Sequence, residues 1–199
     1  MNQAISDLFQ LELPKLEARL ARLLGDIMPP DEAARTACKA RWDAVGKPLG
    51  SLGLLETDTQ KIAALTGSAK LDLSARTLLV FCADNGVVAQ GVSQCGNEVT
   101  GFVPRALAEG RSSACTMARV ARCRVQPVDM GVHGLVGEGI PGLVRCRVMD
   151  GTADFPQGPA MTRTQALQAL LAGAALARQQ AEAGCRLLLI GGMGIGNTT

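Results

Sequence analysis

A continuous apolar run at residues 77–83 constrains the fold of this sequence more than any other feature, and a second, shorter run at residues 186–190, apolar after Arg186, is predicted to be the last buried strand. A continuous apolar run of this length is typical of a parallel strand that is buried on both faces, because helices cover both sides of such a sheet. The second run leads into a glycine-rich turn at residues 191–196. Small residues and turns of this kind favour an α/β fold, and the sequence contains 23 glycines in all.

Weaker patterns predict the other elements of the sheet and its helices. A strand is predicted at residues 124–129, where Pro127 indicates the end of the strand or an edge position. A short strand is predicted at residues 142–148, and helices at residues 99–109, 112–121 and 162–183, the last capped by Thr162 and closed by Gly184. A sheet of three or four strands whose last turn has no helix after it looks unfinished, so we expect a truncated chain.

The first 70 residues have a different pattern and are predicted to be helical. Leucines at three- and four-residue spacing form the apolar stripe of an amphipathic helix over about residues 13–27. Asp31 is a candidate N-cap for a second helix, and a third helix is predicted at residues 54–65. We therefore expect an N-terminal helical region, residues 1–70, followed by the first part of an α/β domain, residues 71–199.

The composition excludes several classes of function. The 20 Lys and Arg against 18 Asp and Glu give a net charge of +2, so charge gives no reason to expect a nucleic acid or an anionic membrane as the partner. Only 3% of residues are aromatic, which is too few for a base-stacking platform. The seven cysteines include no CxxC pair and no zinc spacing, so reduced thiols and no metal are expected. With no N-terminal signal pattern and no uninterrupted apolar stretch of membrane length, the expected location is cytoplasmic.

Residue types alone identify few candidate site residues. Glycines after a parallel strand allow backbone N–H groups to approach a phosphate, so the turn at residues 191–196 is a candidate phosphate site; the alternative is a turn that only packs closely. Asp84 follows another strand at the carboxyl edge of the sheet, unless it belongs to an ordinary turn. The only histidine, His133, lies between glycines and is interpreted as a surface loop residue. Glu56 and Glu98 are isolated carboxylates, so no catalytic acid or base is assigned.

A series of ordered motifs makes the chain resemble a known enzyme family. Residues 47–56, Lys-Pro-Leu-Gly-Ser-Leu-Gly-Leu-Leu-Glu, are similar to the KPxGSLGxLE segment of the nicotinate-nucleotide–dimethylbenzimidazole phosphoribosyltransferases. Further matches follow in the family's order, at residues 81–88, 91–93, 98–100, 151–155, 159–162 and 194–199. The resemblance extends from about residue 38 to the last residue and corresponds to the N-terminal portion of the family's chain.

The resemblance implies a phosphoribosyltransferase of cobalamin lower-ligand assembly. Members of the family move phosphoribose from nicotinate mononucleotide to dimethylbenzimidazole, which gives α-ribazole 5′-phosphate and nicotinate. Members have a Rossmann-like parallel sheet and a smaller domain, to which the N-terminal helices of this chain would contribute. Members also form homodimers and need no metal. No cofactor is expected for this chain. The family's general-base glutamate lies beyond Thr199, so no catalytic residue is assigned to this chain, and the chain alone is expected to be inactive.

The resemblance also implies a substrate site built from residues that follow the strands. Backbone N–H groups of the last turn would bind the phosphate, together with the hydroxyls of Thr198 and Thr199. An apolar hollow formed by Cys95, Val103 and Met193 would receive the base. The implied substrate-binding residues are Asp84, Ser93, Cys95, Val103, Met193, Gly194, Gly196, Asn197 and Thr198.

Several departures from the family pattern fall within this site. Gly192 stands where members usually have a glutamate that borders the base pocket, Asn85 where histidine is usual, and Gly96 where proline is usual. Cys95 and Val103 are less polar than the residues of some members, so the preferred base stays open. The alternative interpretation is a non-catalytic nucleotide- or base-binding remnant or subunit with the same fold.

Overall fold

A computed structural model describes residues 3–135 and 139–198, and the chain divides into two compact units. One unit is Leu24–Leu73, and the other joins Met1–Leu23 to Ser74–Thr199. The larger unit therefore includes α1 (Gln3–Leu8) and most of α2 (Leu13–Gly25). The boundary expected at residue 70, between an N-terminal helical region and the first part of an α/β domain, stays a prediction.

The smaller unit is a helical pair that follows its sequence signals closely. Helix α3 (Glu32–Asp43) begins at the predicted cap, where an Asp31 carboxylate oxygen accepts a hydrogen bond from the Ala34 N–H at 2.9 Å. Helix α4 (Leu54–Thr66) ends at Gly67, which has the left-handed conformation that glycine adopts without steric cost. The Trp42 indole N–H donates to the Thr59 hydroxyl at 2.8 Å and links the two helices.

The larger unit is built on a four-stranded parallel sheet with the strand order β3-β2-β1-β4. The strands are β1 (Arg76–Ala83), β2 (Cys123–Gly131), β3 (Val144–Arg145) and β4 (Leu187–Met193). Each pair of neighbouring strands is parallel, so all the carboxyl ends lie at one edge. The predicted α/β fold with a parallel sheet is confirmed.

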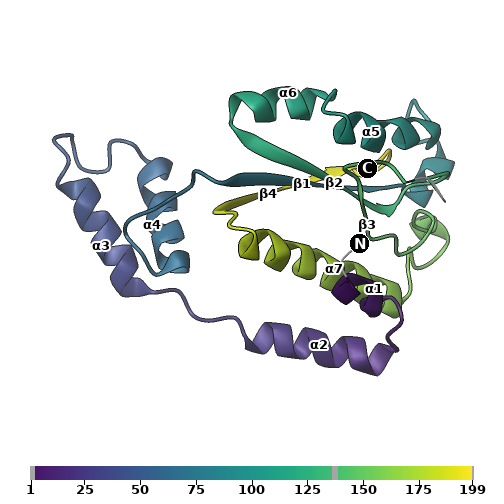
Figure 1. Cartoon of the computed structure of the whole chain (residues 1–199), viewed down its shortest axis with the longest axis horizontal. Helices are drawn as coiled ribbons and strands as arrows, with labels where there is room; N and C mark the ends of the chain where they lie inside the picture. The colour runs from purple at the N-terminus through teal and green to yellow at the C-terminus, as the bar shows by residue number, and fades with distance from the viewer. Residues whose placement is uncertain (1–2, 136–138, 199) are drawn as a thin grey trace. The chain divides into compact units, whose positions relative to one another are not determined.

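Helices cover both faces of this sheet (Figure 1). Helices α5 (Glu98–Ala108) and α6 (Ser113–Val120) lie on one face, and α1 and α7 (Arg163–Glu182) lie on the other. Along β1, Val80 and Cys82 are buried on the α5 side, whereas Leu79 is buried against α7. This burial of both faces is what the continuous apolar run predicted.

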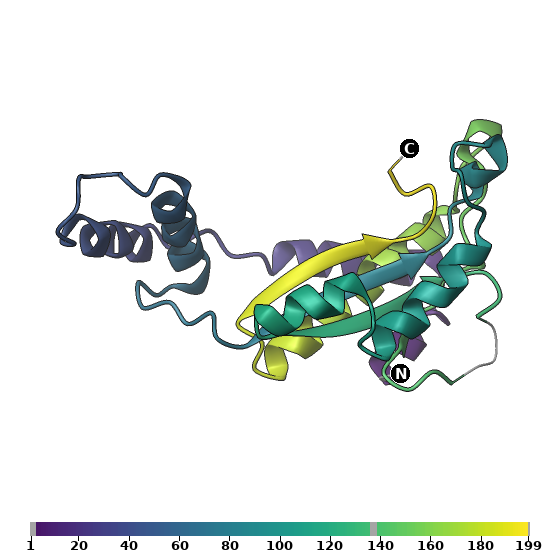
Figure 2. The same cartoon turned by 90° about the horizontal axis from the view of Figure 1, so that it is seen from above.

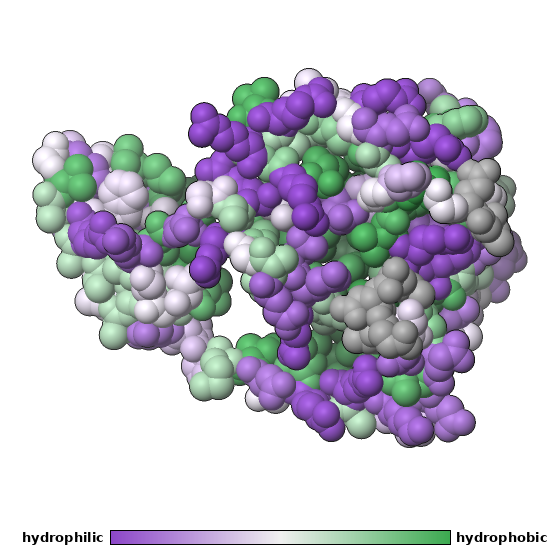
Figure 3. Space-filling view, in the orientation of Figure 1, coloured by the Kyte–Doolittle hydropathy of each residue, from purple (hydrophilic) through white to green (hydrophobic). Residues whose placement is uncertain are grey.

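Helix α2 adds a layer outside α7. Leu16 of α2 is fully buried with Leu167 and Leu171 of α7, so the predicted leucine stripe provides the contact. In the space-filling view, hydrophilic residues predominate along the margin where α2 lies, as expected for the outer face of an amphipathic helix (Figure 3). Among the described residues, no helix is long and apolar enough to cross a membrane.

The structure differs from the sequence predictions at three strands. The strand predicted at residues 142–148 is shorter than expected, since β3 is only Val144–Arg145. Strand β4 continues through Gly191 and Gly192, which were predicted to be part of the turn, because both pair with β1. Strand β2 does not end at Pro127 but runs on to Gly131. On the side of β2 that faces β3, only Val128 and Asp129 are paired. Pro127 therefore has no ladder partner on that side among the described residues. This is an edge position, which proline tolerates because it has no N–H to donate.

Candidate functional site at the carboxyl edge of the sheet

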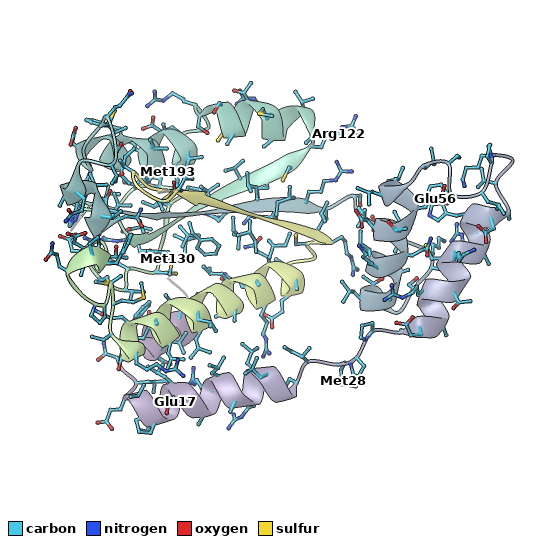
Figure 4. All side chains as sticks on the ribbon, turned by 180° about the vertical axis from the view of Figure 1, so that it is seen from behind. Glu17, Met28, Glu56, Arg122, Met130 and Met193 are labelled. Atoms are coloured by element: carbon cyan, nitrogen blue, oxygen red, sulfur yellow. The ribbon has the colours of Figure 1, made fainter. Side chains whose placement is uncertain are left out.

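The carboxyl edge of the sheet brings together the predicted residues that follow β1 and β4. The two strands are parallel neighbours, with Cys82 opposite Met193, so Asp84 and Gly194 leave the sheet at the same edge, as the sequence predicted. Figure 2 shows β4, in yellow, running beside β1 to this edge, and Figure 4 labels Met193 at its end. Short 3-10 helices, η1 (Gly86–Gln90) and η2 (Phe155–Gln157), lie in the neighbouring loops.

The turn after β4 packs directly onto the end of β1. A Cβ atom on Gly194 would lie 1.8 Å from the Ala83 carbonyl oxygen, which no side chain can tolerate. Gly196 has a φ of 80°, and a Cβ there would lie 2.9 Å from Val88 Cγ2. Both glycines are therefore required for close packing of the turn, the role that the sequence left open beside phosphate binding.

Hydrogen bonds hold Ile195, the residue between these two glycines, at both of its backbone polar groups. Its N–H donates to the Thr100 hydroxyl at 3.3 Å, and its carbonyl accepts from Asn85 Nδ2 at 2.9 Å. The Asn197 N–H donates to the Gly194 carbonyl at 3.3 Å. The set of N–H groups available to a phosphate is therefore smaller than predicted.

Three N–H groups of this turn have no partner within the described residues, those of Gly194, Gly196 and Thr198, and Gly194 is buried. The side chains of Asn197 and Thr198 are exposed. The predicted hydroxyl contact of Thr199 lies outside the described residues. The turn thus retains two N–H donors and one hydroxyl with which it could bind an anion.

Asp84 is fully buried and connects three segments of the site. Its Oδ2 accepts the His133 N–H at 2.7 Å, its own N–H donates to the Gly131 carbonyl, and its carbonyl accepts the Thr152 N–H. The other carboxylate oxygen, Oδ1, is buried without a hydrogen-bond partner among the described residues. Asp84 therefore fixes the backbone at Gly131, His133 and Thr152, and Oδ1 is the carboxylate oxygen that could still bind a ligand.

A second buried carboxylate, Asp129 near the end of β2, fixes the same loop from the other side. Its Oδ1 accepts the N–H groups of Gly131 and Val132, each at 3.0 Å, and Arg147 Nη1 lies 3.5 Å from its Oδ2. Together, Asp84 and Asp129 hold three consecutive amides, those of residues 131–133. The exposed side chain of His133 pairs with Asp150, with 3.0 Å between Nδ1 and Oδ2, so it lies in a surface loop as interpreted but has a specific partner.

The predicted base hollow is assembled only in part. Val103 on α5 and Met193 on β4 both pack against the core cluster between the sheet and α5. Cys95 is exposed in the loop before α5 and is not part of that cluster; its N–H donates to the half-buried Ser93 hydroxyl at 3.3 Å. Gly192 is exposed, and a Cβ there would lie 3.9 Å from Asn197 Nδ2, so the position has room for a side chain.

Sequence reasoning missed Thr100 and Asp129 as parts of this site, and it named Asn85 only as a departure from the family pattern, with no contact assigned to it. Asp129 had a usable signal, because it closes a predicted strand just as Asp84 follows the first one. Asn85 and Thr100 lie within motifs that resemble the family, but nothing in the sequence indicated that both would reach Ile195. Thr152 is a further missed residue, since its hydroxyl accepts the Gly86 N–H at 3.2 Å.

In the smaller unit, the motif at residues 47–56 forms a loop that is closed by a buried ion pair. Lys47 Nζ lies 2.7 Å from Glu56 Oε1, and the two side chains are only 13% and 6% exposed. The same carboxylate oxygen accepts the Leu52 N–H at 3.0 Å. The sequence prediction that Glu56 is an isolated carboxylate is therefore wrong. The hydrogen bond from Lys47, followed by that from the Leu52 amide, lowers the pKa of Glu56 below its usual value of 4.5.

The seven cysteines are all free thiols, in agreement with the expectation that none is paired. Burial raises the pKa of Cys82 to about 12 and that of Cys146 to about 11, so both stay protonated. Over the described residues, no cluster of three or more His, Cys, Asp or Glu side chains could hold a metal ion. Glu98 lies in the first turn of α5, a position that is favourable to a carboxylate because the helix N-terminus carries a partial positive charge.

A parallel α/β sheet with a glycine-rich turn at its carboxyl edge is the kind of fold that binds nucleotide phosphates. The matching family model defines the class more closely: it is described as a phosphoribosyltransferase, and it covers residues 27–199. The chain belongs to the family of the nicotinate-nucleotide–dimethylbenzimidazole phosphoribosyltransferases, which confirms the resemblance.

Individual relatives support this assignment over most of the chain. The nicotinate-nucleotide–dimethylbenzimidazole phosphoribosyltransferase of Halalkalibacterium halodurans is 38% identical over 181 residues, which are 91% of this chain and 50% of the relative. That of Chlorobaculum parvum is 41% identical, over 91% of this chain and 51% of its own length. The crystal structure of the Thermus thermophilus enzyme of the same name superimposes with a TM-score of 0.78 at 40% identity, over 84% of this chain and 51% of that one. The chain thus spans about half the length of the relatives it matches.

Proposed function

We propose that this chain supplies the nucleotide-binding part of an enzyme that moves phosphoribose from nicotinate mononucleotide to dimethylbenzimidazole. The products would be α-ribazole 5′-phosphate and nicotinate. The observation that carries the proposal is the turn at residues 194–198, which is held against β1 at the carboxyl edge with the N–H groups of Gly196 and Thr198 unpaired within the described residues. Membership of the family supports the choice of substrates.

In the proposed reaction, the chain's own residues bind and orient the substrates. The turn and the Thr198 hydroxyl bind the 5′-phosphate, and the apolar surface at Val103 and Met193 receives the methylated ring. A ring nitrogen of the base attacks the anomeric carbon, nicotinate leaves, and the proton on the attacking base passes to a glutamate, which the resemblance places outside these 199 residues. Ser93, Cys95 and Asn197 are proposed to border the site. No metal or cofactor takes part, and the working form is a homodimer in the cytoplasm.

A second candidate is nucleotide or base binding without turnover, which Gly192 favours because this position offers no carboxylate to the base pocket. The two candidates are distinguished by joining residues 1–199 to the part of the Halalkalibacterium halodurans relative that lies outside the alignment. The fusion is incubated with nicotinate mononucleotide and dimethylbenzimidazole, and α-ribazole 5′-phosphate is measured by chromatography. We expect product from the fusion and none from the 199-residue chain.

The same fusion with Gly192→Glu tests the role of the missing carboxylate, and the unmodified relative is the positive control. A higher rate in the Gly192→Glu fusion would show that the glycine limits turnover. No product from either fusion, with an active relative beside them, would favour the non-catalytic candidate. Product from the 199-residue chain alone would overturn the assignment of the general base to a segment outside it.

A further inference from the structure

We infer that Asn85 and Thr100 are positioning residues that hold the turn at residues 194–198 in the shape that binds the phosphate of the nucleotide. This inference rests on the proposed function and adds to it two side chains that do not themselves contact the substrate. They come from different segments, Asn85 from the position just before η1 and Thr100 from α5.

The two side chains bind the two backbone polar groups of a single residue. Asn85 Nδ2 donates to the Ile195 carbonyl at 2.9 Å, and the Thr100 hydroxyl accepts the Ile195 N–H at 3.3 Å. One residue held at both its donor and its acceptor has its peptide planes fixed in orientation. The flanking glycines, 194 and 196, are meanwhile pressed against Ala83 and Val88, so the centre of the turn is immobilised from both sides.

Both positioning residues are themselves held in place. Thr100 is fully buried, so removing its oxygen would leave the half-buried Ile195 N–H without this acceptor. Asn85 precedes η1, and its carbonyl accepts the Val88 N–H at 3.2 Å. The chain's own residues therefore build the arrangement, with no group from a ligand in it.

The consequence for binding concerns the amides that follow Ile195. With the Ile195 N–H used internally, and apart from the buried Gly194, the N–H groups of Gly196 and Thr198 are the donors that the turn leaves open among the described residues. Fixed N–H groups bind an anion without the entropic cost of ordering a loop. Loss of either positioning side chain should therefore weaken binding of the phosphate group and leave the contacts of the pyridine ring and the ribose unchanged.

The experiment compares two ligands that differ only in the phosphate, nicotinate mononucleotide and nicotinate riboside, by calorimetric titration into the 199-residue chain. Thr100→Val and Asn85→Leu remove the two hydrogen bonds with little change in volume. Thr116→Val on α6 and Gln90→Leu in η1 are the matched controls, because their polar groups bond elsewhere, to Ser112 and Asp154. We expect each test variant to lose about 3- to 30-fold in affinity for the mononucleotide, the range for one buried hydrogen bond, and less than about twofold for the riboside.

A second measurement needs no ligand. Amide hydrogen exchange at Ile195 should become faster in Thr100→Val and stay as in the unaltered chain in Thr116→Val. Unchanged exchange in Thr100→Val would overturn the inference, and so would equal losses for both ligands, since these would reflect general destabilisation.

The failure of this inference and the failure of the proposed function are distinguishable. If the unaltered chain prefers the mononucleotide and both test variants keep that preference, the function stands and the positioning role is overturned. If the unaltered chain does not distinguish the mononucleotide from the riboside, the phosphate-binding function is overturned and the inference falls with it.

Discussion

Loops in both units of this molecule are held by a buried acidic side chain, but the partners of that side chain differ. In the smaller unit, Glu56 closes the loop at residues 47–53 through the ammonium group of Lys47 and one amide. At the carboxyl edge of the larger unit, Asp84 has no ion-pair partner among the described residues and is bonded to the His133 amide. The turn after β4 is held without a charged group, by the hydrogen bonds of Asn85 and Thr100 to Ile195 and by the close packing that Gly194 allows against Ala83.

This difference shows which changes each region should tolerate. An ion pair fails when either side chain is replaced or discharged, whereas a loop fixed by packing of backbone atoms fails when any atom is added. The carboxyl edge should therefore be more sensitive to added volume, and the loop at residues 47–53 more sensitive to charge and pH.

The largest effect is expected for Gly194→Ala. Its Cβ would lie 1.8 Å from the Ala83 carbonyl oxygen, so the turn must move away from β1, at a cost of about 3 kcal/mol in the free energy of unfolding. Urea denaturation measures this loss. Gly192→Ala is the matched control, since its Cβ has only an ordinary contact at 3.9 Å, and it should change stability by less than about 0.5 kcal/mol. Equal effects of the two substitutions would contradict this account of the turn.

A smaller loss, of about 2 kcal/mol, is expected for Asp84→Ala, because the fully buried carboxylate would be removed and the His133 N–H would lose its acceptor. Asp150→Ala serves as the comparison. Its exposed carboxylate pairs with His133 and Arg147 at the surface, and such pairs contribute about 1 kcal/mol or less. Thermal or urea unfolding of the two variants measures the difference. A larger effect of Asp150→Ala would mean that the surface pairs, rather than the buried carboxylate, fix the loop after β2.

Lys47→Met tests the ion pair of the smaller unit without changing the length of the side chain greatly. Lys47 is the main cause of the lowered pKa of Glu56, so this pKa should rise toward its usual value when Lys47 is replaced, while the Leu52 amide continues to lower it. Carboxyl ¹³C chemical shifts followed through a pH titration measure the change. Lys61→Met, which removes the cation of the exposed Lys61–Asp58 pair, should leave the Glu56 titration unchanged.

The smallest effect is expected from pH alone. Because the pKa of Glu56 is lowered in the folded chain, the ion pair stabilises the fold fully above pH 4.5, and this contribution is lost as the pH falls through the lowered value. Amide exchange in residues 47–53 should therefore become faster, relative to the rest of the chain, below pH 4.5. The Lys47→Met chain should lack this acid-dependent change, and its persistence there would assign the change to another group.

The elements that the sequence predicted well are those whose signal is local. The run at residues 77–83 predicted β1, and Asp31, Thr162 and Gly67 marked the ends of helices within one or two residues. The contacts that define the candidate site are not local: Asn85 and Ile195 are 110 positions apart, and Thr100 and Ile195 are 95 apart. No pattern within a short stretch of the sequence can indicate contacts between residues that lie so far apart.

The difference between local signals and long-range contacts also explains where the sequence predictions were wrong. Gly191 and Gly192 form strand rather than turn because β1 provides the hydrogen-bonding partners, and this overrides the low strand propensity of glycine. Glu56 was interpreted as unpaired because its partner depends on how the loop at residues 47–53 closes. Helix α1 was missed because six residues are too few to display helical periodicity.

The distribution of the thiols makes the chain suitable for site-directed labelling without mutagenesis. Cys95 is the only one of the seven cysteines that is exposed, while Cys82 and Cys146 are buried with strongly raised pKa values. A maleimide reagent at neutral pH should therefore react first at Cys95, in the loop that precedes α5. A fluorophore or spin label attached there would place a spectroscopic reporter beside Ser93, on the segment proposed to border the base.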